Sequence, residues 1–118
     1  MSSAVIVLTT LSASTDATPF ARSLVESGLA ACVNVLPPMT SIYRWKGTIE
    51  EDVEQQLLIK TSADRVEALQ AHFNRVHPYE IAEFLVVPIS GGSPAYLRWL
   101  ADSLGPVPAP APGGTERS

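Results

Sequence analysis

The stretch NRVHPYEIAEF gathers side chains that can perform acid–base or metal chemistry. His77, Tyr79, Glu80 and Glu83 fall within seven positions of one another. A histidine beside carboxylates can titrate near neutral pH or ligate a metal ion. Because a residue before proline is pushed out of the helical region, His77, which precedes Pro78, cannot share a helical face with Glu80. The spacing therefore excludes a helical H-x-x-E metal motif and predicts a polar corner.

This corner has three interpretations. In an oligomer, His77, Tyr79, Glu80 and Glu83 would line a cleft between subunits and bind a small molecule or a metal. Alternatively, they hydrogen-bond backbone groups and fix the turn, because buried polar groups need partners. An enzyme with His77 as general base and Glu80 orienting it is the third option. The sequence offers no nucleophile or cofactor motif to complete such a site, so we expect no catalytic residues.

Cys32 is the softest metal ligand in the chain and, once deprotonated, would suit copper or zinc. The alternative is a small apolar residue buried in the core. As the chain has one cysteine, four soft ligands cannot come from a single subunit, and an intramolecular disulfide is excluded. A lone thiol also fits a reducing compartment, so we expect a cytoplasmic protein.

A run of carboxylates, EEDVE, follows at residues 50–54. It could bind a hard cation or copper, or it could simply face water. Strand alternation would separate Glu51 from Glu50, Asp52 and Glu54, so the four carboxylates cannot converge within one chain. Around a threefold axis, however, three copies of one carboxylate could form a weak cation site.

Composition narrows the class of partner. The 118 residues are 46% hydrophobic and 17% charged, which describes one soluble domain with a real core. A net charge of −4, with scattered arginines, argues against nucleic acid, which requires clustered basic residues. The N-terminal apolar run AVIVLTTL is too short to cross a bilayer, so we expect no membrane association.

The hydrophobic pattern predicts alternating strands and helices. An apolar, β-branched strand at residues 4–11 is followed by a helix capped by Thr18 and ended by Gly28. Residues 30–45 are strand-like but broken at Pro37-Pro38. Residues 47–61 continue as an extended strand after a tight turn at Lys46-Gly47.

The second half of the pattern repeats the first. A capping box at residues 61–64 introduces a second helix with its buried stripe on Val66, Leu69, Phe73 and Val76, and with His72 pointing to solvent. Residues 82–89 form the last strand, and Ser93-Pro94 begins a terminal helix. We assign residues 1–104 to one domain and residues 105–118, rich in Pro, Ala and Gly, to a flexible tail.

The order β-α-β-β-α-β predicts an α+β, ferredoxin-like antiparallel sheet with two helices on one face and a C-terminal helix. Its two middle arms, residues 30–45 and 47–61, are far longer than the usual five or six residues of a strand. Short helices cannot cover such a hairpin, and its far half would be an unprotected edge. We therefore expect identical subunits to associate through this hairpin.

The motifs GLAACVNVLP, SIYRWKGTIEEDVEQQLLIKT, HPYEIAEFLVVPI and YLRWL resemble the CutA divalent-cation-tolerance family, in the same order and spacing. The resemblance implies a homotrimer with a role in copper tolerance and no established catalytic reaction. It also implies copper(II), or another divalent cation, bound at Cys32 and Glu54, with no obligatory cofactor. We expect a weak metal binder or signalling scaffold, with an unidentified protein partner. The alternative is a PII-like regulatory module that binds a small molecule between subunits.

Overall fold

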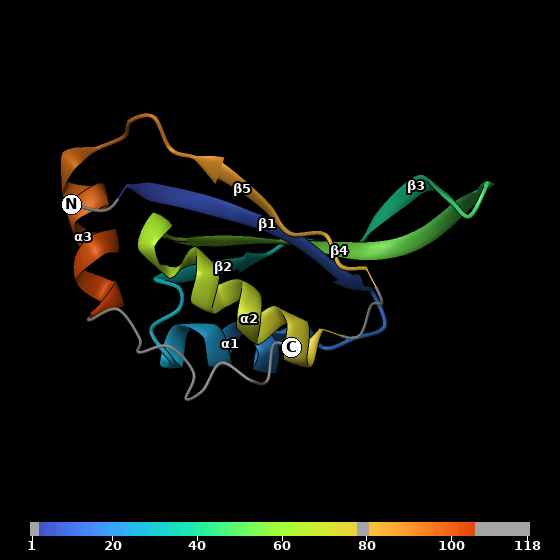
Figure 1. Cartoon of the computed structure of the whole chain (residues 1–118), viewed down its shortest axis with the longest axis horizontal. Helices are drawn as coiled ribbons and strands as arrows, with labels where there is room; N and C mark the ends of the chain where they lie inside the picture. Colours follow the sequence, from blue (N-terminus) through green and yellow to red (C-terminus); the bar gives the residue numbers. More distant parts are fainter. Residues whose placement is uncertain (1–2, 78–80, 106–118) are drawn as a thin grey trace.

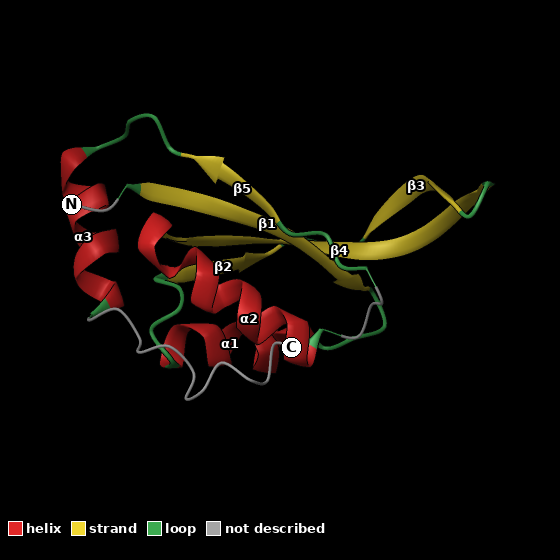
Figure 2. Ribbon diagram, in the orientation of Figure 1, coloured by secondary structure: helices red, strands yellow, loops and turns green. Residues whose placement is uncertain are grey.

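The computed structural model describes residues 3–77 and 81–105. Over these residues the chain forms one five-stranded antiparallel sheet with helices packed on one face and at one end (Figures 1 and 2). The elements are β1 (Ala4–Ser12), α1 (Ala17–Glu26), β2 (Cys32–Val35), β3 (Met39–Trp45), β4 (Thr48–Ser62), a 3-10 turn (Ala63–Arg65), α2 (Val66–Val76), β5 (Leu85–Pro88) and α3 (Pro94–Leu104). The predicted α+β class and element order are confirmed, with the second strand divided into β2 and β3.

Strand β4 organises the sheet. Its inner half pairs with β1 on one side, from Ala4 opposite Ser62 to Ser12 opposite Glu54, and with β2 on the other. Its outer half pairs with β3, and together they extend well beyond the helices (Figure 1). The order β2-β4-β1-β5 leaves β2 and β5 at the edges of the body of the sheet.

The core lies between the sheet and helices α1 and α2. Odd-numbered side chains of β1 and β4 point into it, because successive strand residues alternate between faces. Leu24, Leu69, Val7 and Ile59 are fully buried there. Phe73 contributes edge-to-face contacts with Phe20 and Phe84, at ring-centre distances of 5.3 and 5.1 Å, an arrangement that aromatic pairs favour.

Helix α1 begins earlier than predicted and ends as predicted. Asp16, not Thr18, is the N-cap, and its Oδ1 accepts a hydrogen bond from the Thr18 N–H at 3.2 Å, as capping side chains do. At the other end, Gly28 adopts a φ of +78°. The Gly28 N–H donates to the Val25 carbonyl, and the Leu29 N–H donates to the Leu24 carbonyl, which is the Schellman arrangement.

Two backbone features shape the hairpin. Lys46 and Gly47 both have positive φ, 51° and 82°, as a two-residue type I′ turn requires. The break at Pro37-Pro38 follows the bond from the Leu36 N–H to the Gln56 carbonyl, at 2.9 Å. Since proline lacks an N–H, pairing with β4 stops there and resumes at Met39. The predicted turn and break are both confirmed.

Several local predictions were wrong. Val76, predicted in the buried stripe of the second helix, is 47% exposed, and the buried residues of α2 are Leu69 and Phe73. The last strand covers only Leu85–Pro88, not residues 82–89, because Phe84 turns towards Phe73 in the core. Residues 61–62 belong to β4 rather than to a capping box, because the buried Thr61 hydroxyl donates to the Leu29 carbonyl at 2.8 Å. His72 is half-buried and stacks on Phe20, with 6.4 Å between ring centres. Burial, with a smaller contribution from Arg75, lowers its pKa, because both disfavour the charged form.

Arg65 joins the ends of three helices. Its side chain is 3% exposed, and its guanidinium donates to the carbonyl of Gly28 after α1, at 3.0 Å, and to the carbonyl of Gly105 after α3. A third bond reaches the Ser62 hydroxyl at 3.2 Å. This burial is tolerated because the planar fork of donors finds several acceptors.

The segment predicted as a tail falls at residues 106–118, outside the described residues, apart from Gly105. Across residues 3–77 and 81–105, no helix combines the length and apolar character needed to cross a membrane.

Replacing Gly28 tests the junction between α1 and α3. In Gly28→Ala, the new Cβ would lie 3.1 Å from the Leu104 carbonyl oxygen and force an L-residue into the left-handed region. We expect a loss of about 1–2 kcal/mol in the free energy of unfolding, measured by urea denaturation at fixed protein concentration. Gly91→Ala is the control, because a Cβ there meets nothing within 4 Å. Equal stability of the two variants would contradict this account of the junction.

Candidate functional site

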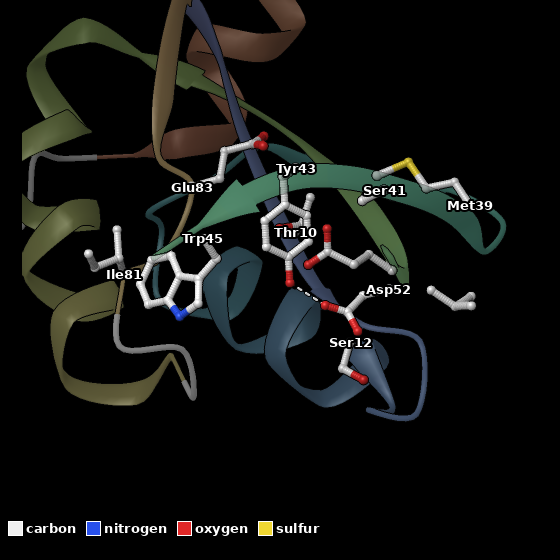
Figure 3. Close-up of a pocket in the computed structure, with 11 residues that line it drawn as sticks. Thr10, Ser12, Met39, Ser41, Tyr43, Trp45, Asp52, Ile81 and Glu83 are labelled. Atoms are coloured by element: carbon white, nitrogen blue, oxygen red, sulfur yellow. Dashed lines mark hydrogen bonds between the residues drawn. The ribbon is translucent and has the colours of Figure 1, made fainter. Parts of the chain in front are cut away.

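A cavity of about 600 Å³ opens where the β3–β4 hairpin leaves the body of the sheet. It lies on the face of the sheet opposite α1 and α2, which we call the open face. This face carries even-numbered residues of β1 and β4, because odd-numbered residues fill the core. The cavity is lined from β1, β3, β4 and the segment before β5 (Figure 3), by Thr10, Ser12, Met39, Ser41, Tyr43, Trp45, Asp52, Val53, Glu54, Ile81 and Glu83.

The hairpin supplies an aromatic wall and two carboxylates. Register pairs Tyr43 with Glu50 and Ser41 with Asp52, so Tyr43 and Asp52 are diagonal neighbours on one face. The Tyr43 hydroxyl donates a hydrogen bond to Asp52 Oδ2 (Figure 3). This bond, then burial and then the nearby carboxylates raise the pKa of Tyr43 from 10.0 to about 12. Tyr43 therefore stays protonated as a donor throughout the physiological range.

Glu83 approaches the cavity from the other side. Gln56 Nε2 donates to Glu83 Oε2 at 2.9 Å and to the Thr9 carbonyl at 2.6 Å. Gln56 thus holds the Glu83 carboxylate against the junction of β1 and β4. Thr10, opposite Gln56 in the register, is 6% exposed and lines the cavity.

His77 is placed beside the cavity but does not line it. It follows α2 in an extended conformation, with φ −74° and ψ 135°, as its position before proline predicts. Its Nε2 lies 2.8 Å from the Thr10 carbonyl, which can only accept, so the ring nitrogen donates. The ring also packs on Phe73, with 5.7 Å between centres. In this arrangement His77 ties the corner to β1. Tyr79 and Glu80, predicted beside it, lie outside the described residues.

Cys32 lies on β2 opposite Lys60, half-buried, with its Sγ 3.9 Å from Asn34 Oδ1. Glu54 lies on β4 opposite both Met39 and Ser12, and it lines the cavity. Since Lys60 and Glu54 are six positions apart on one strand, Cys32 and Glu54 are separated by about 20 Å within one chain. The two predicted copper ligands are not brought together by a single subunit.

A metal site of the usual kind does not form from the described side chains. Over residues 3–77 and 81–105, no group of three or more His, Cys, Asp and Glu residues is close enough to hold a metal ion. The predicted ligands therefore do not fit a closed centre within one chain, where three or four donors must converge.

Sequence reasoning identified Glu54 and Glu83 but missed the aromatic wall as part of a site. Tyr43 and Trp45 fell within the long arm predicted at residues 30–45, and Thr10 within the strand predicted at residues 4–11. The signal that could have found them is register. The turn at Lys46-Gly47 fixes which β3 residues oppose the acidic run, and alternation then puts Tyr43 and Asp52 on one face.

The fold and the site define a ferredoxin-like protein with an elongated hairpin and an acidic, aromatic cavity at the hairpin's base. Residues 5–103 match the model of the CutA1 divalent ion tolerance protein family. The chain belongs to this family.

Individual relatives agree with this assignment. A CutA homolog of Xenopus laevis is 53% identical over 88 residues, which are 75% of this chain and 58% of that protein. The CutA1 structure from Thermus thermophilus has a TM-score of 0.82 at 41% identity, covering 86% of this chain and 99% of that one. The structure described as a PII-like CutA from Nostoc has a TM-score of 0.77 at 33% identity, covering 88% and 97%. This chain spans about half the length of the animal relatives it matches.

The bond between Tyr43 and Asp52 can be tested by titration. Removing the charge in Asp52→Asn should lower the pKa of Tyr43 from about 12 towards 10.0, since Asp52 is the main cause of the shift. The measurement is tyrosinate absorbance against pH, with Tyr43→Phe subtracted to isolate this residue from the other tyrosines. Glu51→Gln, which removes a neighbouring carboxylate from the opposite face, should leave the titration unchanged. An unshifted titration in Asp52→Asn would show that the bond does not form in solution.

Proposed function

We propose that this protein is a cytoplasmic homotrimer that acts in divalent-cation tolerance, with copper as its metal, as a weak metal binder or signalling scaffold. Family membership supports the link to divalent cations, as the family description and the names of bacterial relatives both refer to tolerance of these ions. Features of the hairpin and of the open face support the trimer and the metal chemistry.

The observation that supports association is the exposed apolar surface of the hairpin. Ile42, Ile49 and Val53 are 66%, 56% and 56% exposed. Ile42 pairs with Glu51, so its diagonal neighbours on the same face are Ile49 and Val53. Burying such a side chain contributes about 1.5–3 kcal/mol, and a contiguous exposed patch is typical of an interface.

The open face and the β5 edge provide a second apolar surface. Leu85 and Val87 on β5 are 56% and 42% exposed, and they share a face with Leu8 and Ile6 of β1. A hairpin that reaches past its own helices can cover this surface on another subunit, because β5 has an unpaired edge. If each subunit makes this contact with the next one around a ring, the ring closes and no β5 edge remains unpaired.

Metal binding in this proposal uses more than one subunit. Cys32 and Glu54 lie on the open face, about 20 Å apart within a chain by the rise of a strand. A neighbouring copy would have to supply the complementary donor at each position. Copper(II) accepts nitrogen, oxygen and sulfur ligands, so mixed sites of modest affinity are the expected result.

The second candidate is a PII-like regulatory module that binds a small molecule between subunits. The cavity of about 600 Å³ favours it, because this volume lies in the range of ligand pockets. Glu83, predicted for such a cleft, lines the cavity, whereas His77 contacts the β1 backbone nearby. In the trimer, the hairpin would lie against a neighbour and enclose the cavity further.

Light scattering coupled to size exclusion tests the assembly. We expect a trimer for the natural chain and a smaller, folded species for Ile42→Lys, because the new charge would have to be buried in the interface. Gln70→Lys, the same charge change on the exposed face of α2, should remain trimeric. A natural chain that is a stable, folded monomer would overturn the proposal.

Titration calorimetry with copper(II) tests the metal chemistry. The assembled protein should show saturable binding at micromolar metal, and Cys32→Ala and Glu54→Gln should each weaken it by about tenfold, since each removes a charged ligand. Glu51→Gln removes a carboxylate of the same acidic run whose side chain points to the opposite face of the hairpin. This variant should bind copper(II) as the natural chain does. Absence of saturable binding by the natural trimer would rule out the metal role.

A further inference from the structure

We propose that the cavity at the base of the hairpin binds an elongated organic cation, a linear diamine or polyamine. This inference rests on the second candidate function, the small-molecule module, and gives the chemical class of its ligand. Three features of the cavity support it: the charge of the lining, the separation of its carboxylates and its aromatic wall.

The lining is one-sided in charge. Asp52, Glu54 and Glu83 are among its eleven residues, and it contains no Lys, Arg or His among the described residues. Glu54 and Glu83 are half-buried, whereas Asp52 is exposed. Half-buried carboxylates interact with a cation more strongly than they would in open water, because the surrounding protein has a lower dielectric constant. The same charge opposes nucleotides and other anionic ligands, which need basic residues or helix N-termini.

The carboxylates are too dispersed for a single metal ion. Asp52 lies on the outer part of β4, whereas Glu83 is held by Gln56, four positions further along the same strand. Four strand residues span about 13 Å. No three acidic, histidine or cysteine side chains converge among the described residues. Negative charge at two ends of one cavity matches a ligand with two separated ammonium groups.

Both end carboxylates are oriented and retain acceptor capacity. Asp52 accepts from Tyr43, and Glu83 accepts from Gln56. An ionised carboxylate can accept about four hydrogen bonds, so each can also accept from an ammonium group. Because the side chains are already fixed, binding would cost less conformational entropy than at mobile surface residues.

The middle of the cavity suits an alkyl chain. Tyr43 and Trp45 form its aromatic wall, with Met39 and Ile81 adding apolar surface (Figure 3). Aromatic faces attract ammonium groups, and the Lys46 ammonium already lies 5.6 Å from the centre of the Trp45 ring. An ammonium group of a ligand would make the same kind of contact, so we expect Lys46 to compete with it for the Trp45 ring.

Thr10 adds an observation independent of the acidic residues. Thr10 is 6% exposed and lines the cavity. Its hydroxyl oxygen can accept a hydrogen bond from a ligand N–H. An ammonium group bound near Glu83 would supply that donor.

Calorimetry of the assembled protein with putrescine and spermidine tests the proposal. In an amine-free, low-salt buffer we expect saturable binding, tighter for the longer and more highly charged spermidine. The neutral analogue butanediol should not bind. Asp52→Asn and Glu83→Gln should each weaken binding about tenfold, because each removes a charge while keeping the shape and the acceptor oxygen.

Two variants serve as matched controls. Glu51→Gln removes a carboxylate adjacent to Asp52 that points to the opposite face, so it should bind both amines as the natural chain does. Lys46→Asn removes the competing ammonium and keeps a residue that tolerates the positive φ found before Gly47, so it should bind more tightly. Absence of saturable binding, equal binding of butanediol, or unchanged binding in both Asp52→Asn and Glu83→Gln would overturn the inference.

Failure here can be separated from failure of the proposed function. Light scattering of the same samples reports whether the trimer forms, and copper titration of Cys32→Ala reports on the metal. A trimer that binds copper but no amine would refute only the ligand class. A trimer that binds a nucleotide in place of an amine would keep the small-molecule module and refute the cation.

Discussion

The length of β4 sets the constraint on which the rest of the structure depends. Its fifteen residues span roughly 45 Å at the rise of a strand. Helices α1 and α2, with ten and eleven residues, cover only about 15 Å each at the rise of a helix. The inner half of β4 is therefore buried between two strands and two helices, and the outer half has only β3 beside it. Both the exposed apolar patch and the cavity arise where helical cover ends and the strand continues.

The cavity has a mixed character because it lies on the open face, which α1 and α2 do not cover, so its residues can be charged or aromatic. Asp52 and Glu54 continue the alternation that places Gln56 and Lys60 on the open face. Tyr43 and Trp45 face them from β3, and Glu83 closes the other side because Phe84 is anchored in the core against Phe73. Core packing thus positions a carboxylate on the opposite side of the sheet.

Much of the fold could be predicted from the sequence because its signals are local. The β-branched run of β1, the Schellman glycine of α1, the turn at Lys46-Gly47 and the break at Pro37-Pro38 each act through a few neighbouring residues. The errors were tertiary in origin. The end of β4 depends on the Thr61 bond to Leu29, the start of β5 on Phe84, and the half-buried ring of His72 on Phe20.

The candidate site was less predictable, because its members come from distant parts of the chain. Glu54 and Glu83 were identified as single acidic residues, but their shared cavity requires the pairing of β1 with β4 and the placement of Gln56. The two residues predicted as copper ligands show the converse. Cys32 and Glu54 belong to neighbouring strands, yet register places them far apart, and no local pattern carries that information.

The type I′ turn at Lys46 and Gly47 has a further consequence for the order of folding. It brings β3 and β4 together through contacts between residues close in sequence, which form within microseconds in isolated hairpins. Pairing of β1 with β4 must instead close a long loop and forms more slowly. We therefore expect the hairpin to form before the body of the sheet. The Pro37-Pro38 break separates β3 from β2, so substitutions in the outer half of the hairpin should disturb the pairing of β1 and β2 with β4 less than substitutions in the inner half.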